Sequence, residues 1–247
     1  MKRYLFVAAL LGAAVGMGSE QRNPVLVELF TSEGCSSCPA ADALLEQLDR
    51  QQPIAEALVV VLSEHVDYWN HDGWIDPFSS PAFTYRQEQY ARRFGISGPY
   101  TPQMVVDGAV EFVGNDSRQA GDAIRSSARQ EKIAVRLVPP ASGRATVHLE
   151  AGAFPAGKHR KAGVWVAFAE NSGSSNVLRG ENRGRSLHHV AIVRDLRQVG
   201  SVSDRSGCTI DVPVSRGARV IAFVQEAGNG RVWGVAEASL PPAAGVQ

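Results

Sequence analysis

The stretch from Val25 to Leu48 constrains the fold of this chain most. Residues 25–30, "VLVELF", form a short apolar run that is typical of a buried strand. "CPAADALLEQLDR" follows from Cys38, with apolar residues at a helical spacing. A second apolar run, "ALVVVLSEHVDYW", begins at Ala57. Strand, helix and strand in this order predict a βαβ unit in which the two strands run parallel.

Two cysteines, Cys35 and Cys38, stand where the first strand leads into the helix. Three interpretations fit a pair at this spacing: a structural disulfide, half of a metal site, or a working dithiol. Free N–H groups and the helix dipole at a helix start favour the thiolate of Cys35, which is the attacking form. Cys38, one turn further, would be more shielded and would resolve a mixed disulfide. A structural zinc site needs two more ligands at suitable spacing, and no second CxxC exists.

The N-terminus predicts export. Lys2 and Arg3 precede an apolar run of about a dozen residues, which is the pattern of a secretory signal peptide over residues 1–18. We therefore expect a periplasmic or secreted protein, where disulfides form and persist, with no membrane span in the mature chain. The formal net charge is zero, so no basic surface indicates a nucleic-acid partner.

Turn and cap signals divide the rest of the chain. An irregular insertion is expected near 67–82, then a helix from about Ala82 to Phe94 that starts at Ser80-Pro81 and stops at Gly95. A hairpin turning at 107–108 and a last helix from 116 or 117 complete a domain over 19–130. Six β-rich runs over 131–240 predict an antiparallel, sandwich-like second domain, and residues 241–247 read as a disordered tail.

Two motifs resemble thioredoxin over roughly residues 24–130. They are "VLVELFTSEGCSSCP", a strand leading into CxxC, and "ARRFGISGPYTPQMVVDG", which is similar to the segment around the thioredoxin cis-proline with one residue inserted. The resemblance implies a cis bond at Thr101-Pro102 beside Cys35, where these two residues would shape the substrate groove, with Pro99 as a second candidate for the cis bond. It also implies that Glu28, one position further from Cys35 than in that family, acts as an acid below the dithiol. A glutamate held in a salt bridge is the alternative for Glu28.

A closer resemblance covers nearly the whole mature chain. "ELFTSEGCSSCPAADALL", "HVDYWNHDGWIDPFSSPAFTYRQ", "YTPQMVVDG" and "GENRGRSLHH" are similar to an uncharacterised family of secreted bacterial proteins with a thioredoxin-like core. This resemblance implies an α/β thioredoxin-like N-terminal domain and an exported location. It implies no reaction, so the chemistry has to come from the residues.

The sequence favours an exported thiol-disulfide oxidoreductase that acts on protein or small thiol substrates and uses no cofactor. Its expected site residues are Cys35, Cys38, Thr101, Pro102 and Glu28. One alternative is a periplasmic copper chaperone, with the metal bound by Cys35, Cys38 and His65. Another is a redox-silent module that binds a partner through its β-rich half.

Several other residues have a structural interpretation beside a functional one. His65 follows the second strand and is more often a hydrogen-bonded structural histidine than a metal ligand. Trp69, Trp74 and Phe78 would pack the insertion or form a hydrophobic shoulder for a partner. The Gly180–His189 stretch is expected to be a loop entering a strand, with a binding role as the alternative. Cys208 is expected to be an apolar core residue rather than a third redox partner.

Overall fold

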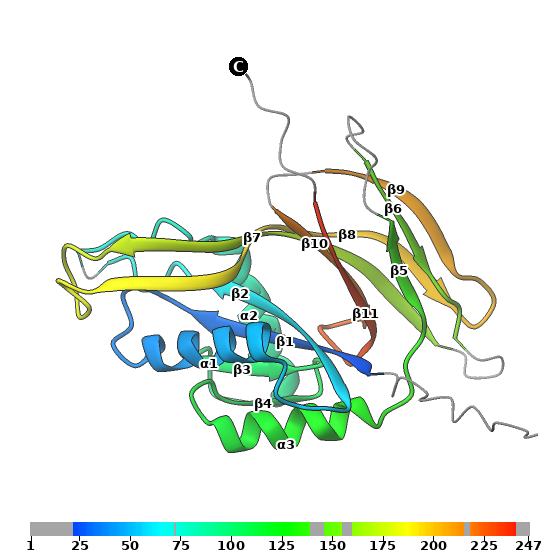
Figure 1. The fold of residues 1–247 in the computed structure, drawn as a ribbon, viewed down its shortest axis with the longest axis horizontal. Helices are drawn as coiled ribbons and strands as arrows, with labels where there is room; N and C mark the ends of the chain where they lie inside the picture. The colour runs from blue at the N-terminus through cyan, green and yellow to red at the C-terminus, as the bar shows by residue number, and fades with distance from the viewer. Residues whose placement is uncertain (1–21, 72, 139–145, 155–159, 215–217, 241–247) are drawn as a thin grey trace, which may run out of the picture.

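The computed structural model describes residues 22–71, 73–138, 146–154, 160–214 and 218–240 (Figure 1). These ranges hold eleven strands and three helices. The elements are β1 (Asn23–Thr31), α1 (Cys38–Gln51), β2 (Ala57–His65), α2 (Pro81–Phe94), β3 (Gln103–Val106), β4 (Val110–Val113), α3 (Ser117–Ala128), β5 (Val135–Val138), β6 (Thr146–Ala151), β7 (Lys161–Asn176), β8 (Ser186–Ser203), β9 (Cys208–Pro213), β10 (Arg219–Glu226) and β11 (Val232–Ser239). The predicted signal peptide and C-terminal tail lie outside the described residues.

The first half of the chain confirms the predicted βαβ unit. β1 pairs parallel to β2 and antiparallel to β3, and β3 forms an antiparallel hairpin with β4. Thr31 lies opposite His65, so β1 and β2 end side by side. The β3–β4 turn lies at Asp107 and Gly108, which both have positive φ. A Cβ on Gly108 would lie 2.1 Å from the carbonyl oxygen of Gly230, so this position requires glycine.

The helices cover opposite faces of this sheet. α1 and α3 pack through Leu45 and Ile124 on the face that carries Val27, and α2 packs through Phe83 on the face that carries Leu26. Ser80 caps α2, which ends at Gly95 with a φ of 68°. Asp116 caps α3 by accepting from the backbone N–H of Gln119. Each cap confirms the one expected from the sequence.

The second half of the chain extends the same sheet. The strand order is β11-β10-β7-β8-β2-β1-β3-β4, and the join is a parallel pairing of Ser63 in β2 with Ile192 in β8. β5, β6 and β9 form a separate three-stranded sheet. Its Leu149 and Val212 pack with Val164 and Val220 of the large sheet, so this part is a two-layer β structure. The described residues after 131 form strands and no helix, as expected, but four of these strands belong to the N-terminal sheet.

β7 and β8 make a long hairpin, here called the arm, that reaches from the two-layer part to the start of α1 (Figure 1). Residues 161–176 pair with residues 186–203, and the register shifts after Val164 and Phe168. These irregularities let the strands bend from one environment into the other. The turn between them, residues 177–185, is the arm tip. No helix among the described residues is long and apolar enough to cross a membrane.

Candidate active site

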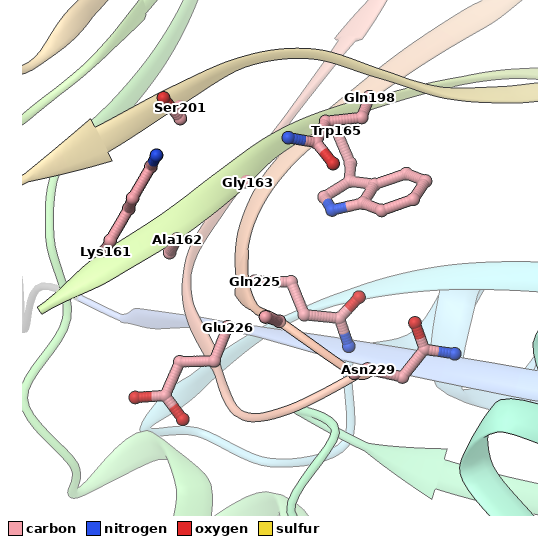
Figure 2. Close-up of a pocket in the computed structure, with 11 residues that line it drawn as sticks. Lys161, Ala162, Gly163, Trp165, Gln198, Ser201, Gln225, Glu226 and Asn229 are labelled. Carbon is pink, nitrogen blue, oxygen red and sulfur yellow. The ribbon is translucent and has the colours of Figure 1, made fainter.

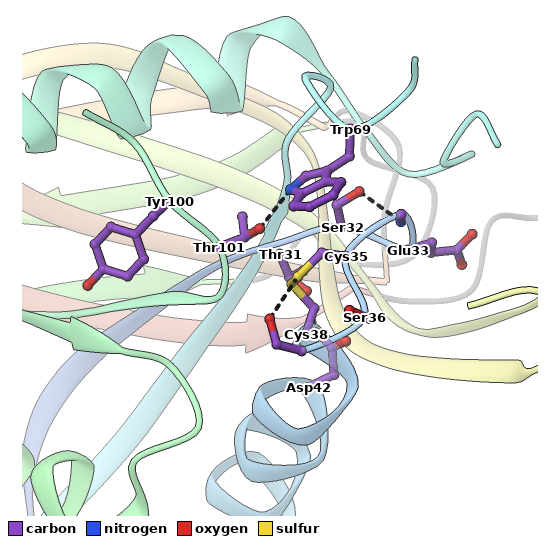
Figure 3. The surroundings of a disulfide bond; sticks show 12 residues. Thr31, Ser32, Glu33, Cys35, Ser36, Cys38, Asp42, Trp69, Tyr100 and Thr101 are labelled. Atoms are coloured by element: carbon purple, nitrogen blue, oxygen red, sulfur yellow. Dashed lines mark hydrogen bonds between the residues drawn. A yellow bond between two sulfur atoms is a disulfide. The ribbon is translucent and has the colours of Figure 1, made fainter. Parts of the chain in front are cut away.

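Cys35 and Cys38 form a disulfide where the loop after β1 enters α1 (Figure 3). Their Cα atoms lie 5.4 Å apart. Cys38 is the first residue of α1, Ser37 is its N-cap, and Pro39 lies in the first turn. The backbone N–H of Cys38 donates to the carbonyl of Cys35 at 3.2 Å, and the Cys35 Sγ lies 3.4 Å from the Ser37 hydroxyl. The exposed fractions are 1% for Cys35 and 0% for Cys38, so both cysteines are covered and the predicted greater shielding of Cys38 amounts to almost nothing.

The Thr101–Pro102 bond is cis, as the resemblance implies. Trp69 comes from the insertion and donates from its Nε1 to the Thr101 hydroxyl at 2.7 Å (Figure 3). We call residues 32–37, between β1 and α1, the cysteine loop. A Cβ on Gly34 would lie 2.9 Å from the Cβ of Trp69, so Trp69 lies directly against this loop. Trp69 therefore links the cysteine loop to the cis-proline loop. The role of Thr101 and Pro102 in a substrate groove stays a prediction.

Glu33, two residues before Cys35, is fully buried and held from several sides. Its carboxylate accepts from Trp74 Nε1 at 2.8 Å and from the Ser175 hydroxyl of the arm. It also lies 3.3 Å from His189 Nε2. The Glu33 backbone N–H donates to Asp76 at 2.9 Å. The sequence signal for this residue is weak, because one glutamate in a polar loop looks like a surface residue.

His189 in β8 lies between carboxylates. Besides Glu33, its Nδ1 lies 3.6 Å from Asp42 in α1, and Asp42 accepts from the Thr31 hydroxyl at 2.9 Å. Burial alone would lower the pKa of His189, but Asp42 and Glu33 stabilise its cation and raise the pKa to about 10. A charged imidazolium is therefore buried beside the start of α1 at neutral pH.

His65 ends β2 and belongs to the same group. Its Nδ1 lies 2.7 Å from Asp76, and its ring packs edge-on against His189 at a centroid distance of 4.5 Å. Burial alone would raise the pKa of Asp76, but His65 and the backbone N–H groups of Glu33 and Phe78 lower it. We call Glu33, Asp42, His65, Asp76 and His189 the histidine cluster. It confirms the expected hydrogen-bonded role for His65.

The structure does not favour the copper alternative. In the part of the chain that the structure describes, no three His, Cys, Asp or Glu side chains form a group that could hold a metal ion. Cys35 and Cys38 are bonded to each other, and His65 is bound to Asp76.

The arm tip lies on the cysteine loop. Asn182 Nδ2 donates to the backbone carbonyls of Glu33 and Cys35, both at 2.8 Å. The Ser36 backbone N–H donates to Glu181 at 3.0 Å. The "GENRGRSLHH" stretch is thus a turn entering a strand, as expected, and its contacts reach a loop about 147 residues earlier in the chain.

Glu28 lies elsewhere, on the α2 face of the sheet. Its carboxylate accepts from Arg86 at 2.7 Å and from the Tyr90 hydroxyl at 2.5 Å. Glu64 lies 3.6 Å from Arg86, and burial raises the pKa of Glu64 against the lowering effect of Arg86. We call Glu28, Glu64, Arg86 and Tyr90 the arginine cluster. The salt-bridge alternative for Glu28 is thus present, while its implied acid role at the dithiol stays a prediction.

The remaining residues have structural surroundings. Phe78 is buried against His65 and His189, which is the expected packing of the insertion. Cys208 is a free cysteine that packs against the core of the two-layer part. A hollow of about 420 Å³ opens beside Trp165, Gln225 and Asn229 (Figure 2). None of its lining residues comes from the cysteine loop. The side-chain amides of Gln225 and Asn229, which line it, already accept hydrogen bonds from Arg86.

Sequence reasoning missed most of the histidine cluster. Three segments contribute to it: 31–42, 65–78 and 181–189. The last two are dense in His, Asp and Glu beside a strand end, which was a usable signal, whereas Glu33 and Asp42 are the two such residues in 31–42. Their meeting depends on the pairing of β8 with β2, which no local pattern predicts.

Known proteins resemble this chain in sequence and in fold. A thioredoxin from Methanocaldococcus jannaschii is 31% identical over 96 residues, which cover 39% of this chain and 86% of the thioredoxin. The crystal structure of protein AGR_C_4864 from Agrobacterium tumefaciens superposes with a TM-score of 0.73 at 28% identity, covering 92% of this chain and 98% of that one. Residues 26–225 match the family described as "Protein of unknown function (DUF1223)". The chain belongs to this family.

Proposed function

We propose that this protein is a thiol-disulfide oxidoreductase whose redox group is the Cys35–Cys38 pair. The observation that carries the proposal is the disulfide at the start of α1, in a chain of which 96 residues are similar to a thioredoxin. The cis peptide at Thr101–Pro102 and its link to Trp69 add a second loop beside the cysteines.

The order β2-β1-β3-β4, with α1 and α3 on one face and α2 on the other, supports a thioredoxin-like core for the N-terminal half. Residues 1–18 support export as a signal peptide, which would place the dithiol in the periplasm or outside the cell. In that compartment a CxxC pair can cycle between disulfide and dithiol.

The reaction balances without a bound cofactor. With the pair reduced, the Cys35 thiolate attacks one sulfur of a substrate disulfide, and the other substrate sulfur leaves as a thiolate. Cys38 loses its proton and attacks Cys35, which releases the second substrate thiolate and forms the Cys35–Cys38 bond. Two electrons pass from the protein to the substrate. The reverse sequence oxidises a substrate dithiol.

The test follows catalysed reduction of a peptide disulfide by excess dithiothreitol. We expect the wild type to accelerate the reaction, and Cys35→Ser to return it to the uncatalysed rate. Cys38→Ala leaves Cys35 without a resolving thiol. After reduction and removal of the dithiothreitol, it should accumulate a mixed disulfide with the peptide.

Cys208→Ala is the matched control, because it removes the one other cysteine of the chain. It should retain the wild-type rate. A wild type that does not accelerate exchange, or a Cys35→Ser Cys38→Ser double variant as active as the wild type, would refute the proposal.

A further inference from the structure

The arm tip closes one side of the disulfide. Asn182 is 1% exposed, and its Nδ2 bridges the carbonyls on both sides of Gly34, those of Glu33 and Cys35. Trp69 lies against Gly34 on the cysteine loop. With Cys35 only 1% exposed, a substrate thiolate has no open path to its sulfur in this conformation.

Glu181 adds a second attachment. Its carboxylate accepts from the Ser36 backbone N–H, next to Cys35. This pairs a negative charge with a donor close to the sulfur, and a nearby negative charge disfavours the Cys35 thiolate. Moving the tip would therefore both expose Cys35 and remove a charge that opposes its reactive form.

The tip is a compact turn rather than a loose loop. The Gly184 N–H donates to the Val177 carbonyl at 2.8 Å, and the Val177 N–H donates to the Arg185 carbonyl at 2.9 Å. Arg185 also donates to the Asn182 side-chain oxygen at 3.1 Å. The turn can thus shift as one unit, with the Asn182 and Glu181 contacts as its attachments to the cysteine loop.

The outer side of the tip has a distinct chemistry. Leu178 is 69% exposed, and Arg179, Arg183 and Arg185 are all exposed within the turn. The one carboxylate of the turn, Glu181, is directed to Ser36. Ile75 of the insertion, 74% exposed, adds a second apolar side chain on the segment that meets Arg179 through Gly73. Among the described residues, the outer surface of the arm tip is therefore basic, and Leu178 and Ile75 add exposed apolar side chains to it.

We propose that the arm tip is a docking surface for an acidic protein segment, and that docking displaces the tip from Cys35. The preferred substrates of the dithiol are then protein thiols and disulfides, while free small thiols, which gain no binding energy at the tip, react with the disulfide more slowly. This rests on the proposed function. The charge of the surface selects the partner, and only a partner that contacts the tip gains the binding energy to move it.

The exchange step then balances as follows for the oxidised chain. A partner thiolate attacks Cys35 Sγ, the Cys35–Cys38 bond breaks, and Cys38 leaves as a thiolate that takes up a proton. A second partner thiolate attacks the partner sulfur that is bonded to Cys35, and the mixed disulfide breaks to release Cys35 as a thiolate. The partner becomes a disulfide and the protein gains two electrons.

The first test measures how fast dithiothreitol reduces the Cys35–Cys38 bond. Free thiols are trapped with an alkylating reagent, and the mass of the protein is measured by mass spectrometry. Asn182→Asp keeps the shape of the side chain but replaces the donor with a carboxylate facing two carbonyls. We expect reduction at least tenfold faster than in the wild type. Glu181→Ala changes an exposed side chain and should also accelerate it.

Asn176→Asp is the matched control, because it makes the same change at an exposed arm residue. It should react at the wild-type rate. Equal reduction rates for the wild type, Asn182→Asp and Glu181→Ala would refute the claim that the arm tip shields Cys35.

The second test compares two reductants: dithiothreitol and a synthetic peptide with two cysteines flanked by aspartates. The ratio of the peptide rate to the dithiothreitol rate should fall about tenfold in an Arg179→Gln Arg183→Gln variant, and should fall with added salt in the wild type. Arg129→Gln Arg136→Gln removes the same charge at two exposed positions, one at the C-cap of α3 and one in β5, and should retain the wild-type ratio.

An unchanged ratio of peptide rate to dithiothreitol rate in the Arg179→Gln Arg183→Gln variant would refute the claim that the arm tip binds an acidic partner. Both tests follow a single reduction of the protein's own disulfide, so they are readable without catalytic turnover. A wild type that shows no turnover counts against the proposed function, whereas unchanged rates in these variants count against the docking surface alone.

Discussion

The arginine cluster and the histidine cluster lie on opposite faces of the same sheet. Arg86 joins β1 and β2 to α2 and also reaches Gln225 and Asn229 near the β10–β11 turn. His189 belongs to β8 and joins the ends of β1 and β2 to the start of α1. Both clusters thus hold the C-terminal strands against the N-terminal half through buried charge.

The difference between them is the kind of cation. A guanidinium stays charged at any pH that a folded protein meets, so the arginine cluster has one charge state on the cation side. An imidazolium loses its proton, so the histidine cluster changes with pH. The cluster whose cation titrates lies beside the disulfide, and the cluster whose cation keeps its charge is tied to α2. This suggests that stability is concentrated in the first cluster and chemical response in the second.

Arg86→Met should have the largest effect on stability. It leaves Glu28 and Glu64 buried without their cation, and both are fully buried. Breaking a buried pair by removing one partner costs about 3–5 kcal/mol of the free energy of unfolding. Urea unfolding at pH 7 measures it.

A Glu28→Gln Arg86→Met variant is the control for this prediction. It removes one uncompensated carboxylate and should recover part of the lost free energy. A loss in Arg86→Met below about 1 kcal/mol, the range of exposed pairs, would show that the arginine cluster is not a stabilising centre.

His189→Gln should change the pH dependence of stability. The folded chain raises the pKa of His189 from 6.5 to about 10, so the cation stabilises the fold fully below pH 6.5. This contribution is lost as the pH rises through the folded pKa. The wild type should therefore exceed His189→Gln by a few kcal/mol near pH 6, and the gap should narrow toward pH 10.

Unfolding free energies of both proteins at several pH values between 6 and 10 measure this gap. Arg86→Met provides the contrast, since its deficit relative to the wild type should not narrow in the same way. A gap between wild type and His189→Gln that stays constant across the range would mean that His189 is not the titrating cation of its cluster.

Local elements of this fold were predictable because their signals are local. The β1–α1–β2 unit, the Ser80 and Asp116 caps and the Asp107–Gly108 turn each follow from neighbouring residues. The strand β9 around Cys208 was missed, because its alternation of polar and apolar residues is short. The cysteine pair had three interpretations from the sequence, and the disulfide in the structure fits two of them, a structural disulfide and a working dithiol.

The long-range features could not be predicted for a physical reason. β8 meets β2 through a single pairing of Ser63 with Ile192, about 130 residues apart in the chain. This pairing converts an expected separate β structure into an extension of one sheet. It also brings His189 to Asp42 and Asn182 to Cys35, so most of the candidate site depends on it. No residue pattern near 63 or 192 specifies the other.

The smallest expected effect comes from removing single hydroxyl groups that bind carboxylates of the two clusters. The Tyr90 hydroxyl donates to Glu28 and accepts from Arg86 and Gln225, whereas the Thr31 hydroxyl has Asp42 as its one hydrogen-bond partner among the described residues. Thr31→Val keeps the side-chain shape and should cost about 1–2 kcal/mol, because one hydrogen bond to a charged group is lost. Tyr90→Phe, measured by the same urea unfolding, should cost more because three contacts lose their oxygen. If Thr31→Val costs as much as Tyr90→Phe, the histidine cluster is as important for stability as the arginine cluster, and the division of roles between the two faces is wrong.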